Sequence, residues 1–334
     1  MNRSFDIPVV LFLFKRSDTV LRIVQVLSKI KPRKIYLLSD QGRNEEEIQI
    51  VEQTREAIEK SIDWDCEVIK NYAIENRGVY RNIGEGARWV FQNEEHAIFL
   101  EDDNLPEISF FQYCEELLEK YKKNQKILWI CGTNYLGEYD SEYSYMFTQH
   151  LLPCGWASWS DKFLKYYDGE MLTYEDSSKM EKFCKSYKSR ALLHQRLESL
   201  NGEYRRKGEN NSFKSWDYQM LFSIRSNEMY GISPIYNQIK NIGADQFSIH
   251  GGTSLDKTMT KRFCEIPTKE LVFPLKHPME IKIDENYEKL ISKIILLPLD
   301  MRIKLRVNLF IKKLLHIDPY SSLSDELKKR LNKK

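Results

Sequence analysis

Short apolar runs alternate with helical patterns through the first 130 residues of the chain. The runs have the length and composition of buried strands, and the segments between them repeat apolar residues every three or four positions. Strands are expected at residues 8–14, 34–38, 66–69, 97–100 and 127–131. Helices are expected at residues 20–27, 45–61, 84–93 and 110–123. This order predicts βαβ units, and therefore an α/β fold with a Rossmann-like sheet flanked by helices.

The remainder of the chain is less regular. Residues 135–174 are rich in Tyr, Trp and Gly without a clean period, and we interpret them as loops. Beyond residue 276, two helical segments are broken by Pro298, and residues 301–334 hold ten Lys or Arg against three Asp or Glu. We expect one domain at residues 1–275, its first half at 1–105 and its second at 106–275, followed by a basic helical extension at 276–334.

The net charge of +2 conceals this asymmetry, because the chain before the basic tail is slightly acidic. Such a body lacks the basic face that nucleic-acid binding requires, so we expect no nucleic-acid partner. The six cysteines show no CxxC spacing and are expected to be reduced. The segment before the first strand has neither a signal peptide nor a membrane span, which predicts a cytoplasmic protein.

Three carboxylates directly follow the strand expected at residues 97–100. Ligands of open α/β sheets gather at the carboxyl ends of strands, and Glu101, Asp102 and Asp103 stand there. Adjacent carboxylates repel one another and normally need a cation, and oxygen ligands suit Mn²⁺ or Mg²⁺. We expect Asp103 to be the direct ligand and a diphosphate to supply the others. The alternative is that the triplet caps a helix beginning near Pro106.

Other polar residues follow the first three strands. Arg16 follows the first and Asp40 the second, where they could bind the phosphates and the base or ribose of a nucleotide. Asn76 and Arg81 lie around a glycine before a helix, an arrangement that suits an anion. A solvated surface accounts for each of these residues equally well when it is taken alone.

Ser215-Trp216-Asp217 places a carboxylate beside a large aromatic side chain. An apolar neighbour raises the pKa of a carboxyl group, as a general base needs, and an indole can stack on a sugar ring. A helix cap before the apolar pattern that follows explains Asp217 equally well. His250 precedes two glycines, so a loop could bring it to a phosphate or a metal, although a single His is more often structural.

Seven motifs follow one another along about residues 7–255. They are Val9-Val-Leu-Phe-Leu-Phe-Lys-Arg16, Leu38-Ser-Asp-Gln-Gly-Arg43, Glu75-Asn-Arg-Gly78, Leu100-Glu-Asp-Asp103, Cys154-Gly-Trp-Ala-Ser-Trp159, Ser215-Trp-Asp217 and Asn241-Ile-Gly243. In this order the chain resembles bacterial GT-A glycosyltransferases of the hemolytic-protein-like kind. It is more distantly similar to the Golgi N-acetylglucosaminyltransferase that initiates complex N-glycans.

The resemblance implies a GT-A fold and a metal-dependent inverting transferase of hexoses or N-acetylhexosamines. The donor would be a nucleotide diphosphate sugar, with UDP favoured, and the acceptor a glycan, a lipid-linked molecule or a protein, as in polysaccharide biosynthesis. The implied roles are metal and donor binding for Glu101, Asp102 and Asp103, the catalytic base for Asp217, nucleotide contacts for Arg16 and Asp40, and the acceptor side for Gly155 and Trp156.

Two other functions share this sheet. A sugar-1-phosphate nucleotidyltransferase should carry a Gly-rich basic loop after the first strand, but residues 14–18 contain no glycine. A non-catalytic carbohydrate-binding protein would not need the carboxylate triplet together with Asp217. We therefore expect the transferase.

The basic tail admits two interpretations. A helix with one apolar face and surrounding Lys and Arg residues can lie on an anionic membrane, here the inner face of the plasma membrane, where lipid-linked acceptors are found. The alternative is that the same face packs against the rest of the chain or against a second subunit. Packing against a second subunit would make the protein an oligomer.

Overall fold

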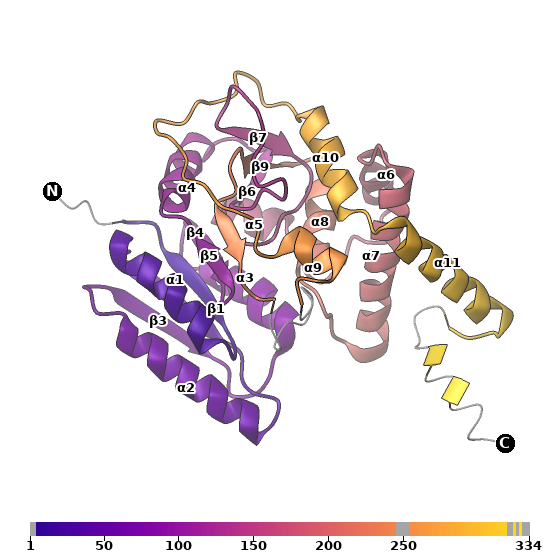
Figure 1. The fold of residues 1–334 in the computed structure, drawn as a ribbon, viewed down its shortest axis with the longest axis horizontal. Helices are drawn as coiled ribbons and strands as arrows, with labels where there is room; N and C mark the ends of the chain where they lie inside the picture. The colour runs from indigo at the N-terminus through magenta and orange to yellow at the C-terminus, as the bar shows by residue number, and fades with distance from the viewer. Residues whose placement is uncertain (1–4, 245–253, 319–322, 325–326, 329–334) are drawn as a thin grey trace.

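The computed structural model describes residues 5–244, 254–318, 323–324 and 327–328, and Figure 1 shows a central sheet with helices on both of its faces. The strands are β1 (Val9–Leu13), β2 (Lys34–Ser39), β3 (Glu67–Tyr72), β4 (His96–Glu101), β5 (Asn104–Pro106), β6 (Ile127–Cys131), β7 (Tyr145–Thr148), β8 (Trp156–Trp159), β9 (Tyr230–Pro234) and β10 (Ile239–Asn241). The helices are α1 (Ser17–Ile30), α2 (Glu45–Ser61), η1 (Tyr80–Glu85), α3 (Gly86–Phe91), α4 (Ser109–Lys120), α5 (Ser160–Tyr166), α6 (Ser177–Lys185), α7 (Arg190–Asn210), α8 (Asp217–Ser226), α9 (Thr258–Phe263), α10 (Glu285–Ile295) and α11 (Leu299–Leu314).

The main sheet is mixed and has eight strands in the order β3-β2-β1-β4-β8-β6-β9-β7. Its first four strands are parallel, with β1 at the centre between β2 and β4. The chain then reverses, because β8 pairs antiparallel with both β4 and β6. The sheet therefore begins as the predicted Rossmann-like βαβ series, and the prediction of an α/β fold is confirmed.

Both faces of the sheet are buried, which explains why its strands read as continuous apolar runs. Along β1, Val10 and Phe12 belong to one hydrophobic core, while Val9, Leu11 and Leu13 belong to the other. Helices α1, α2 and α4 close the second core, and α3, α5, α8 and α10 close the first. Every residue of β1 is thus packed, and its carboxyl end is held in a fixed position.

The prediction of loops over residues 135–174 is wrong in part. This region contains β7, β8 and α5, and β8 inserts at the centre of the sheet. Trp156 and Trp159, at the two ends of β8, are both buried. Large aromatic side chains buried on both faces of a short strand leave no alternation to detect, so tertiary packing decided the structure here.

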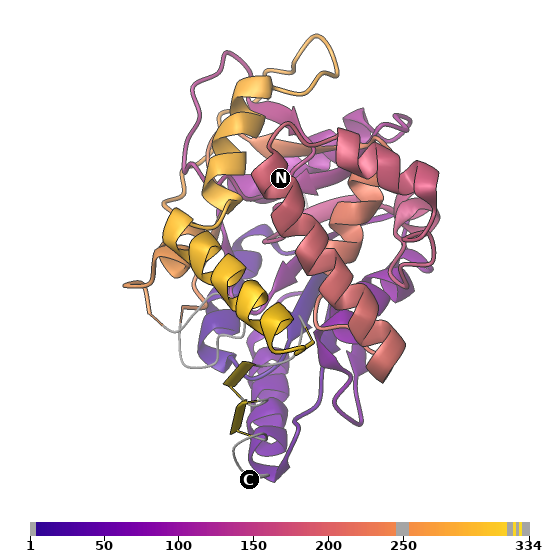
Figure 2. The ribbon, with the colours of Figure 1, turned by 90° about the vertical axis from the view of Figure 1, so that its right-hand side faces the viewer.

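The predicted boundary at residue 275 does not separate two structures. The break at Pro298 between two helices is confirmed, but α10 belongs to the first core through Tyr287, Ile291 and Ile295. Its Glu288 accepts hydrogen bonds from Thr148 and Gln149, both at 2.5 Å. Among the described helices, α11 extends away from the body (Figures 1 and 2). None of the described helices is long and apolar enough to cross a membrane.

A buried contact between His150 and Glu288 fastens α10 and gives folding a pH dependence. His150 Nε2 lies 3.1 Å from Glu288. Burial lowers the pKa of His150 to about 4. The negative charge of Glu288 raises this pKa in part, and the positive charge of Arg225 lowers it further. The unfolded chain, with an ordinary His pKa of about 6.5, therefore takes up a proton between these values that the folded chain does not.

We expect the free energy of unfolding to fall by about 2–3 kcal/mol as the pH decreases from 7 to 4.5. Urea unfolding followed by circular dichroism at both pH values measures this. His150→Gln, which cannot take up the proton, should show a smaller decrease than the wild type. An equal decrease in both proteins would contradict the assignment to His150.

Candidate functional site

The carboxylate triplet lies where the two central parallel strands end. Phe12 of β1 is in register with Glu101, the last residue of β4. Just beyond, the backbone N–H of Phe14 donates a hydrogen bond of 3.2 Å to Asp102 Oδ2. The turn after β1 and the triplet after β4 are therefore joined directly, at the sheet edge where α/β proteins bind ligands.

Asp103 is held by three polar side chains. Its Oδ2 lies 2.6 Å from Arg16 Nη1, and its Oδ1 accepts hydrogen bonds from Asn104 at 2.6 Å and Asn241 at 3.2 Å. Arg16 is only 9% exposed and also lies 3.6 Å from Asp102. A buried guanidinium needs such acidic neighbours, so Arg16 and the triplet form one unit.

A glycine allows this unit to close. β10 pairs antiparallel with β5, which sets Asn241 opposite Asn104 and brings residues 241–243 beside the triplet. Arg16 Nη2 donates to the carbonyl of Gly243 at 3.3 Å. A Cβ at Gly243 would lie 2.1 Å from Asp103 Oδ2, so no side chain fits there without displacing the carboxylate.

Glu101 is a carboxylate whose pKa is raised by its surroundings. Burial raises its pKa well above the usual range, and the charges of Asp103, Asp102 and Asp217 raise it further, while Arg16 acts in the opposite direction. Its side chain makes no hydrogen bond or ion pair with any described residue. Glu101 therefore marks the place where the triplet and Asp217 come within electrostatic range of each other.

Asp217 is the first residue of α8 and is half-buried. It accepts a hydrogen bond from the hydroxyl of Ser215. The two capping roles that the sequence suggested are not seen. Asp217 follows the N-cap residue Trp216, and no side chain caps α8 there. The carboxylate triplet is followed by the strand β5 and not by a helix. Burial raises the pKa of the Tyr135 hydroxyl, with smaller contributions from Cys154 and Asp217, which places Tyr135 in the same region.

Asp40 holds a loop. Its Oδ1 accepts from the backbone N–H groups of Gln41 at 2.8 Å and Arg77 at 2.7 Å, and its Oδ2 accepts from Gly78 N at 2.9 Å and Asn76 Nδ2 at 3.1 Å. Gly78 has φ +78°, which favours glycine. These bonds occupy the Asp40 carboxylate, so its predicted contact with a base or ribose remains a prediction that would require competition with the loop.

Arg77 and the predicted site residue Arg81 differ in environment. Arg77 points inward and donates to Ser39, Asn71 and Asn82, and burial lowers its pKa. Arg81 lies in η1 and is exposed, so it is the cation that could meet an anion. The structure does not place Arg81 or Asn76 in contact with the triplet.

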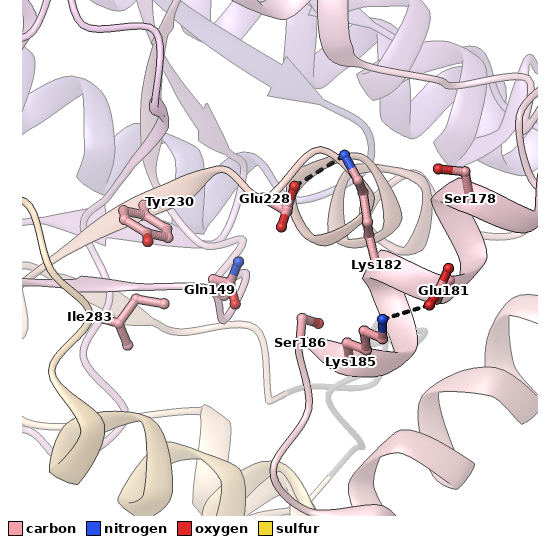
Figure 3. Close-up of a pocket in the computed structure, with 9 residues that line it drawn as sticks. All are labelled: Gln149, Ser178, Glu181, Lys182, Lys185, Ser186, Glu228, Tyr230 and Ile283. Atoms are coloured by element: carbon pink, nitrogen blue, oxygen red, sulfur yellow. Dashed lines mark ion pairs between the residues drawn. The ribbon is translucent and has the colours of Figure 1, made fainter.

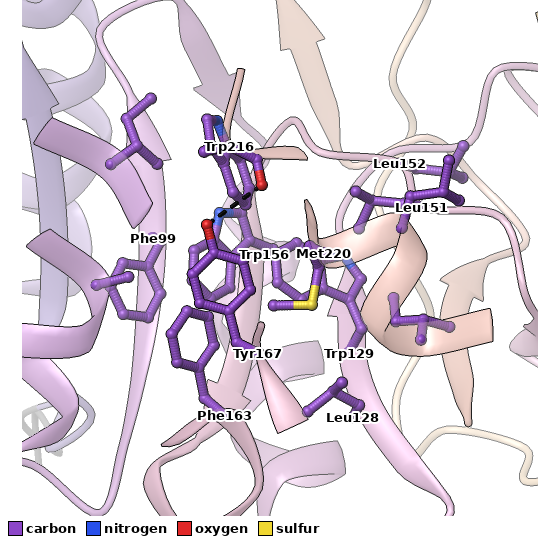
Figure 4. Close-up of a cluster of buried hydrophobic side chains, with 14 of the residues drawn as sticks. Phe99, Leu128, Trp129, Leu151, Leu152, Trp156, Phe163, Tyr167, Trp216 and Met220 are labelled. Carbon is purple, nitrogen blue, oxygen red and sulfur yellow. Dashed lines mark hydrogen bonds between the residues drawn. The ribbon is translucent and has the colours of Figure 1, made fainter. Parts of the chain in front are cut away.

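The two tryptophans of the predicted acceptor side, Trp156 and Trp216, lie inside the protein (Figure 4), and Gly155 is buried as well. The Trp156 ring stacks on Phe99 at 3.9 Å and on Trp129 at 4.2 Å, and Trp216 lies 5.7 Å from Trp156. Trp156 and Trp216 are 1% and 3% exposed, so neither presents an open platform for a sugar. Their size and number were the signal for burial, because an aromatic stack is a core feature as well as a sugar-binding one.

The backbone conformation and hydrogen bonding of Gly155 explain why a glycine stands at this position. Its φ of +61° favours glycine, and its N–H donates 2.8 Å to Asn104 Oδ1, while the Asn104 amide holds Asp103. Asn104 and Asn241 were not predicted as site residues. Their signal in the sequence was adjacency to the triplet for Asn104 and membership of the Asn241-Ile-Gly243 motif for Asn241.

The donor set at this edge suits a hard cation. Among the described residues no group of three or more His, Cys, Asp or Glu side chains forms a complete metal cage. The Asp103 carboxylate accepts two hydrogen bonds at Oδ1 and one at Oδ2, and since a carboxylate accepts about four in all, Oδ2 keeps a lone pair for a cation. Such a site fits Mn²⁺ or Mg²⁺ if a diphosphate supplies most ligands. The second predicted ligand, His250, lies outside the described residues.

A separate surface pocket of about 410 Å³ is lined by none of the predicted site residues (Figure 3). Its charged side chains pair with one another: Lys182 with Glu228 at 3.0 Å, and Lys185 with Glu181 at 2.5 Å. These internal pairs leave little charge for a ligand, and the triplet edge remains the candidate site.

Comparisons with known proteins give partial overlaps. A UDP-glucose pyrophosphorylase complexed with UDP-glucose overlaps 71% of this chain and 94% of its own, with 10% identity and a TM-score of 0.37. HddC from Yersinia pseudotuberculosis complexed with GMP-PN overlaps 51% of this chain and 86% of its own, with 9% identity and a TM-score of 0.33. The 4-diphosphocytidyl-2C-methyl-D-erythritol synthase from Anaerococcus prevotii DSM 20548 overlaps 51% and 81%, with 12% identity and a TM-score of 0.31. No protein-family model and no curated protein matches the sequence.

Proposed function

We propose that the chain is a metal-dependent inverting glycosyltransferase of the GT-A kind. It moves a sugar from a nucleoside diphosphate, with UDP-sugars favoured, to a hydroxyl of a glycan, lipid-linked or protein acceptor. One observation carries the proposal. Asp103 and Asp217 come from distant parts of the chain, and the negative charge of each adds to the burial that raises the pKa of Glu101, yet the two carboxylates have very different hydrogen-bond partners. Asp103 is bound by a guanidinium and two amides, whereas Asp217 is bound by one hydroxyl.

These environments suit two roles. A carboxylate fixed by cationic and amide donors keeps its charge and its direction, as a metal ligand must. A half-buried carboxylate with few donors can accept a proton, as a general base must. Asp217 therefore takes the proton of the acceptor hydroxyl while its oxygen bonds to the anomeric carbon. The bond from that carbon to the diphosphate oxygen breaks, and the configuration inverts.

The donor side is assembled from the triplet and its neighbours. Asp103 would hold Mn²⁺ or Mg²⁺, which when bound stabilises negative charge on the leaving diphosphate. Arg16 orients Asp103 and lies between the turn after β1 and the triplet. The proposed contacts to the nucleotide are two exposed residues, Asn76 in the loop after β3 and Arg81 in η1, together with Asp40.

The nucleotidyltransferase alternative is disfavoured by the turn after β1. Such an enzyme needs a long Gly-rich loop there for a triphosphate. Here β1 ends at Leu13 and α1 begins at Ser17, so three residues without glycine make the connection. Arg16 in this turn is already committed to Asp103.

Product analysis separates the two reactions. Incubation with Mn²⁺, a panel of UDP-hexoses and UDP-N-acetylhexosamines, and a panel of glycan acceptors is expected to release UDP in an acceptor-dependent manner. The same mixtures with pyrophosphate replacing the acceptor are expected to form no UTP. UTP formation from pyrophosphate without acceptor-dependent UDP would overturn the proposal in favour of the nucleotidyltransferase.

A further inference from the structure

Helix α11 carries an apolar ridge that the described part of the chain leaves exposed. The ridge is formed by residues spaced three or four apart, which share one side of a helix. They are Leu299, Ile303, Val307, Phe310 and Leu314. Their exposed fractions run from 51% at Val307 to 63% at Leu314. On the opposite side Lys312 is buried, whereas Met301 and Leu305 are 38% and 49% exposed, so the second half of the helix lies against the body and the ridge points away from it there.

Cationic side chains border this ridge on both sides. At 100° per residue, Lys304 falls along one edge, and Arg306 and Lys313 along the other. All three are exposed, and none forms an ion pair within the described part of the chain. Asp300, in the first turn, is the one acidic residue of α11. Apolar ridges with cationic edges are the pattern of helices that lie in the surface of an anionic bilayer.

The helix is also held in a defined direction. Just before its start, the backbone N–H of Leu297 donates a hydrogen bond of 2.9 Å to Gln195 Oε1 of α7. The Gln195 side-chain amide donates another, of 3.1 Å, to the carbonyl of Ile295. Beyond its end, Asp318 pairs with Arg205, also of α7. Figure 2 shows α11 and α7 running along the same side of the molecule. A surface that receives the ridge therefore lies along the side where α7 packs against α8, the helix that begins at Asp217.

From these observations we propose that α11 docks the protein on an anionic lipid surface. Ile303, Val307 and Phe310 enter the acyl boundary, while Arg306 and Lys313 contact lipid phosphates. A second copy of the chain suits the ridge less well, because two copies of α11 packed ridge to ridge would bring their cationic edges together.

Vesicle flotation of the full-length protein tests this. We expect binding to phosphatidylcholine vesicles containing about 30% phosphatidylglycerol to be at least tenfold tighter than binding to pure phosphatidylcholine, and to weaken in 0.5 M NaCl. Phe310→Glu should lower the affinity at least roughly tenfold, and Arg306→Gln with Lys313→Gln by a similar factor. Val272→Glu, at another position that is 77% exposed, should leave it unchanged.

Mn²⁺-dependent UDP binding and circular dichroism of each variant separate this test from the proposed function, and both are expected to match the wild type. Absence of vesicle binding by folded wild-type protein, equal binding to both vesicle types, or equal loss in Val272→Glu would overturn the proposal. A wild-type dimer that Phe310→Glu converts to a monomer in light scattering would overturn it too, and would assign the ridge to a second copy.

Discussion

Asp217→Asn is expected to lower the rate of sugar transfer by about 10²–10⁴-fold, the usual contribution of a general base. Asparagine has the same shape and can keep a hydrogen bond to Ser215, but it cannot accept the acceptor proton. The affinity for UDP in the presence of Mn²⁺ should change little, because Asp217 acts on the acceptor. Initial rates of acceptor-dependent UDP release, with UDP affinity measured in parallel, check both parts.

Asp161→Asn is a matched control, since Asp161 is an exposed aspartate in the first turn of α5. It should leave the transfer rate unchanged. A loss in Asp217→Asn that falls equally on UDP affinity would place Asp217 on the donor side instead. A rate within a few fold of the wild type would remove it from the reaction.

The first half of the fold was predictable because most of its strands, namely β1, β2, β4 and β6, are buried on both faces. The ends predicted for α2 agree with the structure, and β1, β2, β4 and β6 were located to within a residue or two. Each begins and ends at a change from apolar to polar residues that local sequence shows directly. The position of the carboxylate triplet at the end of β4 also follows the rule for strand ends in parallel sheets.

The remainder depends on contacts between distant residues. Arg16 reaches Gly243 across 227 positions, and Asn241 reaches Asp103 only because β10 pairs with β5. No periodicity in the sequence reports such pairing. Trp156 shows the same limit. An indole suits a sugar-binding platform as well as a core, and only the stacking of Trp156 on Phe99 and Trp129 shows that it belongs to the core.

Asp103→Asn is expected to weaken Mn²⁺-dependent UDP binding by at least about 100-fold. A metal that bridges protein and diphosphate contributes several kcal/mol, and each 1.4 kcal/mol corresponds to a factor of ten in affinity. The change also removes the ion pair with Arg16, which lies at 2.6 Å. Thermal unfolding must therefore show that the variant is folded, and removal of the metal from the wild type gives a second test without any mutation.

Isothermal titration calorimetry of UDP, GDP, CDP and ADP into the wild-type protein, with Mn²⁺ and then with EDTA, measures the central claim most directly. The proposed site predicts binding of one diphosphate, UDP first among them, that EDTA abolishes and that folded Asp103→Asn does not recover. Binding of none of the four, or binding that neither EDTA nor Asp103→Asn changes, would contradict a metal-dependent donor site at the triplet.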